Sequence, residues 1–246
     1  MLNHTAIYVV FVMFLATLIR STVGFGEGLV AVPLLALRVP IAIAAPLAVL
    51  VSVLVAGVIV VQDHRKIEIR SAAGLIVSAM VGIPFGLFLL ASVNDHVVKM
   101  ALGVIIIVFS VYSLNAKTMV HLERDRWGWL LACGFCSGVL GGAYGMNGPP
   151  LAVYGALRRW SPQHFRATLQ GYFFPASLMG LLGYGVLGIW ERTVTRYCLL
   201  SLPGILAAVL IGRALNHRLR GHLFFRFVYA GLIVIGAILL SQALRP

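Results

Sequence analysis

The chain has 246 residues, of which 61% are hydrophobic and 11% are charged, and its formal net charge is +12. A soluble domain carries roughly a quarter of its residues as charged side chains, so this composition excludes a soluble globular protein and predicts an integral membrane protein. The basic residues fall between apolar segments. This favours contact with lipid headgroups and a role in membrane topology, and argues against a nucleic-acid partner.

The apolar segments predict an all-helical, multi-pass fold. The first, at 1–20, lacks a basic start and a small-residue cleavage site, so we expect a retained helix rather than a signal peptide. Later apolar runs approach the roughly 20 residues that a helix needs to cross a bilayer. They lie at 41–61, 71–91, 97–115, 167–188, 195–212 and 223–243. The polar connectors at 62–70, 116–126 and 212–222 are too short for a soluble domain.

Two regions, 6–37 and 127–157, break this pattern. In each, a longer apolar helix is followed by a Gly-rich stretch and then by a shorter apolar helix. The Gly-rich stretches read STVGFGEG and GGAYGMNGPP. Glycine and proline are poor in helix interiors, so we expect the first helix to end near Arg20 and the other near Leu140. Non-helical backbone at membrane depth must be buried in protein or line a wet cavity.

The two broken regions resemble each other, and three apolar spans follow each of them. An offset of 117 residues pairs Gly24 with Gly141, Gly28 with Gly145, and Pro33 with Pro150. The chain is therefore predicted to consist of two membrane repeats, 1–115 and 127–246, joined by a cytoplasmic linker at 116–126.

Lysine and arginine favour the cytoplasmic side of a membrane protein, which gives the orientation of the repeats. If each broken region crosses the membrane once, both sides carry equal numbers of these residues. If each is a re-entrant hairpin, the repeats are inverted, thirteen lie on one side, and Arg20 lies within the membrane. The five on the other side are Arg38, Lys99, Arg192, Arg196 and Arg245. We favour the hairpins, with both termini outside a bacterial inner membrane; full crossings are the alternative.

The hairpin tips are the predicted substrate site, as in secondary transporters with inverted repeats. A helix that begins inside the membrane presents unpaired N–H groups and a positive dipole end, which suit an anion. Asn147 suits the cap of the second short helix, and the helix-break prolines are Pro33, Pro149 and Pro150. The predicted substrate-binding residues are Gly24, Phe25, Gly26, Gly28, Gly141, Gly142, Tyr144, Gly145, Asn147, Gly148, Arg166 and Gln170. The alternative for the glycines is close helix packing.

Arg20 and Glu27 flank the first break, and charged residues inside a membrane mark functional sites. Arg20 could attract an anion and Glu27 could carry a coupling proton. A purely structural pair between them is the alternative. Arg166 and Gln170 are four residues apart on one helix face and could line a cytoplasmic vestibule. Arg166 could instead extend to the lipid headgroups.

The three cysteines, Cys133, Cys136 and Cys198, lie in apolar runs. The segment CGFC matches C-x-x-C, but a redox site needs an exposed, reactive thiolate, and an odd number of cysteines is no disulfide framework. We expect apolar packing, and no catalytic residue, metal or cofactor. An intramembrane thiol oxidoreductase is the alternative.

Two stretches, GFGEGLVAVPLLAL and GVLGGAYGMNGPPLAVYGALRRWSPQHFRATL, resemble the signature regions of the TauE/SafE family of sulfite exporters, also called the toluene sulfonate uptake permease group. The first motif of the family is matched by Gly24, Gly26, Gly28 and Pro33. The second is matched by Gly141, Gly145, Gly148, Pro149 and Pro150, with Tyr154 and the segment Arg166–Leu169 after it. Glu27 stands where the family often has glycine.

This resemblance implies export of small sulfur-containing anions such as sulfite or organosulfonates by alternating access. Uptake of another small anion or sulfur compound by the same architecture is the alternative. The implied partners are the anionic substrate, the lipid bilayer and a coupling ion, proton or sodium, and a homodimer is a further option.

Overall fold

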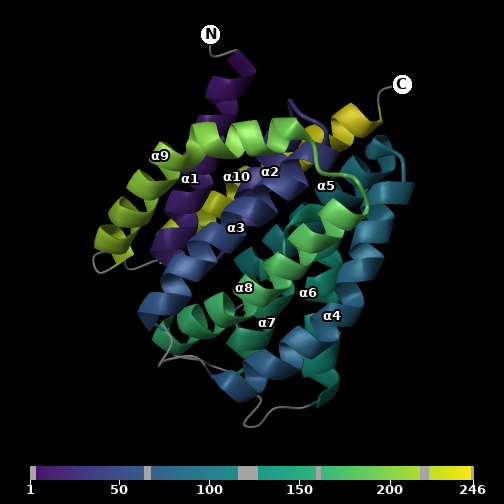
Figure 1. Cartoon of the computed structure of the whole chain (residues 1–246). Helices are drawn as coiled ribbons and strands as arrows, with labels where there is room; N and C mark the ends of the chain where they lie inside the picture. Colours follow the sequence, from purple (N-terminus) through teal and green to yellow (C-terminus); the bar gives the residue numbers. More distant parts are fainter. Residues whose placement is uncertain (1–3, 64–67, 116–126, 159–161, 217–221, 245–246) are drawn as a thin grey trace.

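The computed structural model describes residues 4–63, 68–115, 127–158, 162–216 and 222–244 (Figure 1). Within these ranges the chain forms ten helices and no strand, which confirms the all-helical prediction. The helices are α1 (His4–Val23), α2 (Glu27–Ala36), α3 (Ile41–Asp63), α4 (Ile69–Ser92), α5 (Asp95–Asn115), α6 (Trp127–Tyr144), α7 (Gly148–Leu157), α8 (Pro162–Val186), α9 (Arg192–Asn216) and α10 (His222–Ala243).

Five helices are long and apolar enough to cross a membrane, so the protein is polytopic. They lie at His4–Thr22, Ile41–Val61, Ser71–Ser92, Asp95–Asn115 and Arg192–Gly212. The last four match predicted spans. α8 falls outside this set although a span was predicted at 167–188, and its first half is less apolar. In α10 the described apolar stretch, Leu232–Ala243, is short.

The helix breaks are shorter than the sequence predicted. α1 continues past Arg20 to Val23 and is long enough to cross, and α6 continues past Leu140 to Tyr144. Only 24–26 and 145–147 lie between the helices; we call them the first break and the second break. Most of the Gly-rich stretch GGAYGMNGPP is therefore helical, which corrects the prediction.

α6 remains helical through its glycines because these residues allow it to pack closely against α4. A Cβ atom on Gly138 would lie 2.5 Å from the carbonyl oxygen of Ala79, and one on Gly142 would overlap the carbonyl oxygen of Ile83. Gly86 on α4 meets the backbone of α6 at Val139 in the same way. At Gly142 the structure therefore shows close helix packing, which was the alternative to a role in substrate binding.

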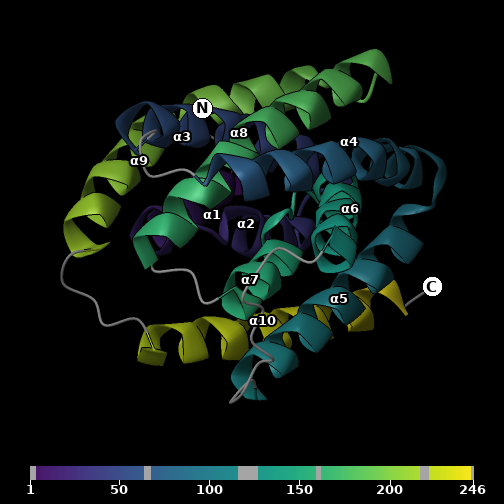
Figure 2. The same ribbon diagram turned by 90° about the horizontal axis from the view of Figure 1, so that it is seen from below.

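The two halves of the chain interleave rather than stand side by side (Figures 1 and 2). α1 packs against α9, and α6 packs against α4, so the first helix of each half lies on the fourth helix of the other. α3 packs against α8, and α5 against α10. α2 lies near the centre, and most of its residues are buried (Figure 2).

The helix ends give the register between the two halves. α1 ends at Val23 and α6 at Tyr144, while α2 begins at Glu27 and α7 at Gly148, and both pairs are 121 residues apart. The offset of 117 taken from glycine and proline matches is therefore about one helical turn too short. At the structural offset Gly24 corresponds to Gly145, and each directly follows the end of a long helix.

Candidate functional site

The two helix breaks lie against each other in the interior. A Cβ atom on Gly28 would overlap the carbonyl oxygen of Gly145, so backbone meets backbone at this point. The Phe25 ring lies beside Gly148, its Cδ2 atom 3.3 Å from where a Cβ atom on that glycine would be. Segments far apart in the sequence thus form one small structure, and glycine is the residue that permits it.

Three glycines in the breaks have positive φ angles. The values are 98° at Gly24, 99° at Gly26 and 64° at Gly145. These are left-handed conformations, which L-residues with a side chain adopt at a cost. Gly24 and Gly145 each close a helix through an N–H bond to a carbonyl four residues back, on Arg20 at 2.6 Å and Gly141 at 2.9 Å. The sequence places glycine where the chain must turn back.

A cavity of about 20 Å³ lies between the breaks. Its lining comes from both breaks and from α1, α2, α3, α7 and α8. It consists of Arg20, Gly26, Glu27, Gly28, Leu29, Ser52, Gly145, Met146, Asn147, Gly148 and Phe173. This volume holds about one water molecule. The cavity is therefore narrow, and an anion with several oxygens would have to widen it.

Arg20 is the basic group of this cavity and is only 2% exposed. Its Nη1 donates to Glu27 and, at 2.9 Å, to the Ser52 hydroxyl. Its Nη2 donates to Gln170 Oε1 at 2.8 Å, and the guanidinium lies 5.2 Å from the centre of the Phe173 ring. A buried cation needs such partners, and three helices, α2, α3 and α8, supply them.

Glu27 is the acidic group, 3% exposed, and its Oε2 forms the ion pair with Arg20. Thr17 donates to its Oε1 at 2.9 Å. Because Glu27 is the first residue of α2, the helix dipole also favours its negative charge. The Arg20–Glu27 pair considered from the sequence is thus formed. Gln170 ties it to the first break by donating from Nε2 to the Gly24 carbonyl at 2.5 Å.

Two buried polar atoms of the lining have no hydrogen-bond partner: Arg20 Nε and Asn147 Oδ1. Asn147 is 5% exposed and directly precedes α7, but its unpartnered Oδ1 does not cap that helix, contrary to prediction. Pro149 and Pro150 occupy the first turn of α7 and have no N–H groups. In the second break the Gly145 and Met146 N–H groups donate to the Gly141 and Leu140 carbonyls, so the free backbone donors around the cavity come mainly from the first turn of α2.

The comparisons with known proteins bear on this site. The family model described as "Sulfite exporter TauE/SafE" matches residues 9–240. The chain belongs to this family. It is also similar to a protein of Cupriavidus necator described as "Probable sulfite/organosulfonate exporter TauE", with 25% identity over 235 residues, 93% of this chain and 91% of that protein. No solved structure matches the chain.

The two stretches that resemble the TauE/SafE signature regions supply most of the cavity lining, but not every predicted site residue lies there. Tyr144 donates its hydroxyl to the Val98 carbonyl at 3.2 Å and is absent from the lining. Gly141 lies under the Asn147 side chain, where a Cβ atom would overlap Oδ1. Gly142 faces α4, as described above. The Arg166 side chain lies outside the described part of the structure.

Other predicted residues lie outside the cavity lining. Gln170 contacts Arg20 and the first break, as described, without lining the cavity. Phe25 packs edge-on against Phe165, with ring centres 5.7 Å apart. Pro33 lies buried inside α2, beyond the break.

Sequence reasoning missed Thr17, Ser52 and Phe173. Thr17 lies three residues before Arg20 on the same helix, a spacing that places both on one face and could have revealed it. Ser52 is a polar residue within the apolar run 41–61, but small hydroxyls are common in membrane helices. Phe173 carries no sequence signal, because its role depends on how α8 packs.

The cysteines lie away from this cavity. Cys133 is buried, Cys136 is exposed on the same helix, and both are free thiols, as is the buried Cys198. None of them lines the cavity. Among the described residues, no cluster of three or more His, Cys, Asp or Glu side chains could hold a metal ion.

Proposed function

We propose that the protein exports small sulfur-containing oxyanions, sulfite or organosulfonates, across a bacterial inner membrane. The family description and the name of the Cupriavidus necator relative support the substrate class. The observation that carries the proposal is the meeting of the two helix breaks around a cavity lined by Arg20. A guanidinium beside helix N-termini matches the oxygens of a sulfite or sulfonate group.

The substrate would bind through backbone N–H groups as well as Arg20. The first intrahelical bond of α2 runs from the Val30 N–H to the Gly26 carbonyl at 3.0 Å, so the N–H groups before Val30 lack helical partners. Gly28 and Leu29 carry two of them and line the cavity. The Asn147 amide would add a hydrogen bond from the second break.

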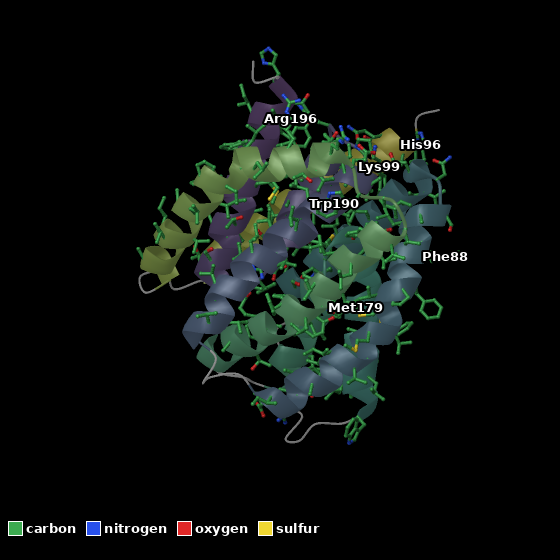
Figure 3. The ribbon with its side chains drawn as sticks, viewed as in Figure 1. Phe88, His96, Lys99, Met179, Trp190 and Arg196 are labelled. Atoms are coloured by element: carbon green, nitrogen blue, oxygen red, sulfur yellow. The ribbon has the colours of Figure 1, made fainter. Side chains whose placement is uncertain are left out.

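The proposed mechanism is alternating access by two inverted repeats, 1–115 and 127–246. The exchange-symmetric packing of the two halves supports it. Both chain ends lie at one end of the molecule (Figure 1). Lys99 and Arg196, assigned to the outer side, lie at that same end (Figure 3). The narrow cavity would then widen toward one side of the membrane at a time as the breaks separate.

Thermal unfolding of the purified protein in detergent tests the substrate class. Sulfite, sulfate, thiosulfate, sulfoacetate, taurine and chloride would each be added to the wild type and to Asn147→Ala. A ligand at a hundred times its Kd stabilises the folded form by about 2.7 kcal/mol. We expect sulfite or a sulfonate to raise the melting temperature of the wild type, and Asn147→Ala to abolish the rise.

Asn115→Ala is the matched control, because this asparagine is exposed at the end of α5 and its side chain donates to the Val111 carbonyl of the same helix. It should keep the full anion response. If cations or neutral thiols stabilise the protein and no anion does, the proposal is wrong. Direction is tested separately, by following sulfite efflux from proteoliposomes, since uptake alone would support the permease alternative.

A further inference from the structure

The cavity already contains an anion of the protein itself. The Glu27 carboxylate lies at the N-terminus of α2, accepts hydrogen bonds from Arg20 and Thr17, and lines the cavity. A guanidinium, a hydroxyl and a helix N-terminus are the groups that a sulfite or sulfonate would use. Glu27 therefore occupies the interactions that an anionic substrate needs.

The charges of the cavity determine whether an anion can bind beside Glu27. Of the described residues that line it, two are charged, Arg20 and Glu27, and their formal charges cancel. A substrate anion that entered this neutral, buried space would carry an unmatched charge next to the Glu27 carboxylate, which is costly. If Glu27 bore a proton, Arg20 would be the unmatched charge and the anion would neutralise it.

We propose that an anion binds to Arg20 only when Glu27 is protonated, so that one proton and one anion occupy the site together. This inference rests on the proposed function. Glu27 takes its proton from the solution that supplies the anion and turns away from Arg20, whose Nη1 then binds a substrate oxygen. After release, the proton returns to the solution on the side where the anion leaves, and the carboxylate pairs with Arg20 again. Anion and proton therefore move in the same direction.

The unpartnered atoms of the cavity agree with this exchange. Arg20 Nε is buried without a hydrogen-bond acceptor while Nη1 is shared between Glu27 and Ser52. A substrate oxygen could accept a hydrogen bond from Nε, which the Glu27 carboxylate leaves unpaired. The carboxylate therefore holds only part of the hydrogen-bonding capacity of Arg20.

Other ionisable groups near Glu27 are few in the described structure. On α9, the Cys198 thiol is buried but does not line the cavity. Arg38 and Tyr8 contact each other, and Tyr8 bonds the Leu34 carbonyl, at the opposite end of α2. α3, the second break and α8 face the cavity with uncharged residues, Ser52, Asn147 and Phe173. Glu27 is therefore the group whose protonation should govern anion binding.

Binding of methanesulfonate to the purified wild type at about pH 6 and about pH 8 tests the inference. The sulfonate keeps one charge across this range, so any proton taken up belongs to the protein. We expect affinity to fall by up to about a hundredfold at the higher pH, tenfold for each pH unit at most. Calorimetry in buffers with different ionisation enthalpies should show uptake of up to one proton per anion.

Glu27→Gln keeps the shape of the side chain without its charge. It should bind methanesulfonate with the same affinity at both pH values and take up no proton. Glu191→Gln, at an exposed glutamate before α9, is the matched control and should keep the pH dependence of the wild type. If Glu27→Gln does not fold, proton uptake by the wild type still decides.

Several outcomes would overturn the inference. Wild-type affinity that is equal at both pH values, without proton uptake, would show that Glu27 and the anion do not exchange. A pH dependence that survives in Glu27→Gln would assign the proton to another group. If no sulfur anion binds to either protein at any pH, the proposed function itself fails, which is a distinguishable result.

Discussion

Gly28 and the carbonyl group of Gly145 meet with no room for a Cβ atom between them, although the two residues belong to different halves of the chain. The contact lies in the wall of the cavity, to which both residues contribute. The first turn of α2 and the second break are thus shaped by each other. A side chain at this point would push the breaks apart.

Gly28→Ala should therefore impair transport and binding more than folding. Its new methyl group meets backbone, which yields less readily than a side chain, and overpacking of this kind costs about 1 to 3 kcal/mol. We expect sulfite efflux from proteoliposomes to fall at least tenfold while the protein still purifies as a folded monodisperse species. Gly185→Ala on α8 has no atom within 4 Å of the added Cβ atom and should keep full activity.

Gly138→Ala should act differently, because Gly138 lies at the packing of α6 against α4 and not in the cavity. The added Cβ atom would lie 2.5 Å from the Ala79 carbonyl oxygen. We expect a loss of about 1 to 3 kcal/mol in unfolding free energy, with anion affinity unchanged in the fraction that remains folded. Loss of anion binding with normal stability would instead place Gly138 in the site.

The sequence predicts the all-helical membrane architecture well, because membrane helices are recognised from local composition and from the spacing of apolar segments. It also brings the residues around 24–28 and 145–148 to attention, since glycine, asparagine and proline in an apolar run have few uses. The predicted extent of the breaks was wrong, because the prediction relied on the low helix propensity of glycine. In this fold Gly138 and Gly142 continue α6, since contact with α4 outweighs their propensity.

The register of the repeats and the partners of Arg20 could not be predicted from the sequence, for a different reason. Matching Gly28 to Gly145 gave an offset of 117, whereas the helix ends differ by 121, because glycines of the two halves serve different purposes. Ser52 and Gln170 reach Arg20 from α3 and α8, which pack against each other. No local pattern carries that information.

The Arg20–Glu27 pair should be strongly coupled in stability. Arg20→Met leaves the buried Glu27 carboxylate unpaired, and Glu27→Gln leaves the Arg20 charge without a counter-ion, so each single change should cost about 3 to 5 kcal/mol. The double variant removes both charges and should be more stable than Arg20→Met alone. A double-mutant cycle from unfolding in denaturant measures the coupling. Additive losses would show that the two charges act independently.

The cysteines should be dispensable for transport. Cys133 and Cys136 lie outside the cavity, so replacement of both by alanine should leave sulfite efflux within about twofold of wild type, with a small loss of stability from the buried Cys133. Efflux is measured beside unfolding of the same preparation. Loss of transport in a stably folded variant would favour the thiol oxidoreductase interpretation.

The last prediction concerns membrane topology, and two reporter fusions test it. With re-entrant breaks, the chain after Asn115 lies in the cytoplasm and the C-terminus lies outside, so the two points are on opposite sides. With full crossings through both breaks, they lie on the same side. A reporter that fluoresces only in the cytoplasm should be bright when fused after Asn115 and dark when fused at the C-terminus, with the reverse pattern for a reporter active only outside. Equal signals at both points would contradict the hairpins, and exchanged signals would keep the hairpins but invert the protein, against the distribution of lysine and arginine.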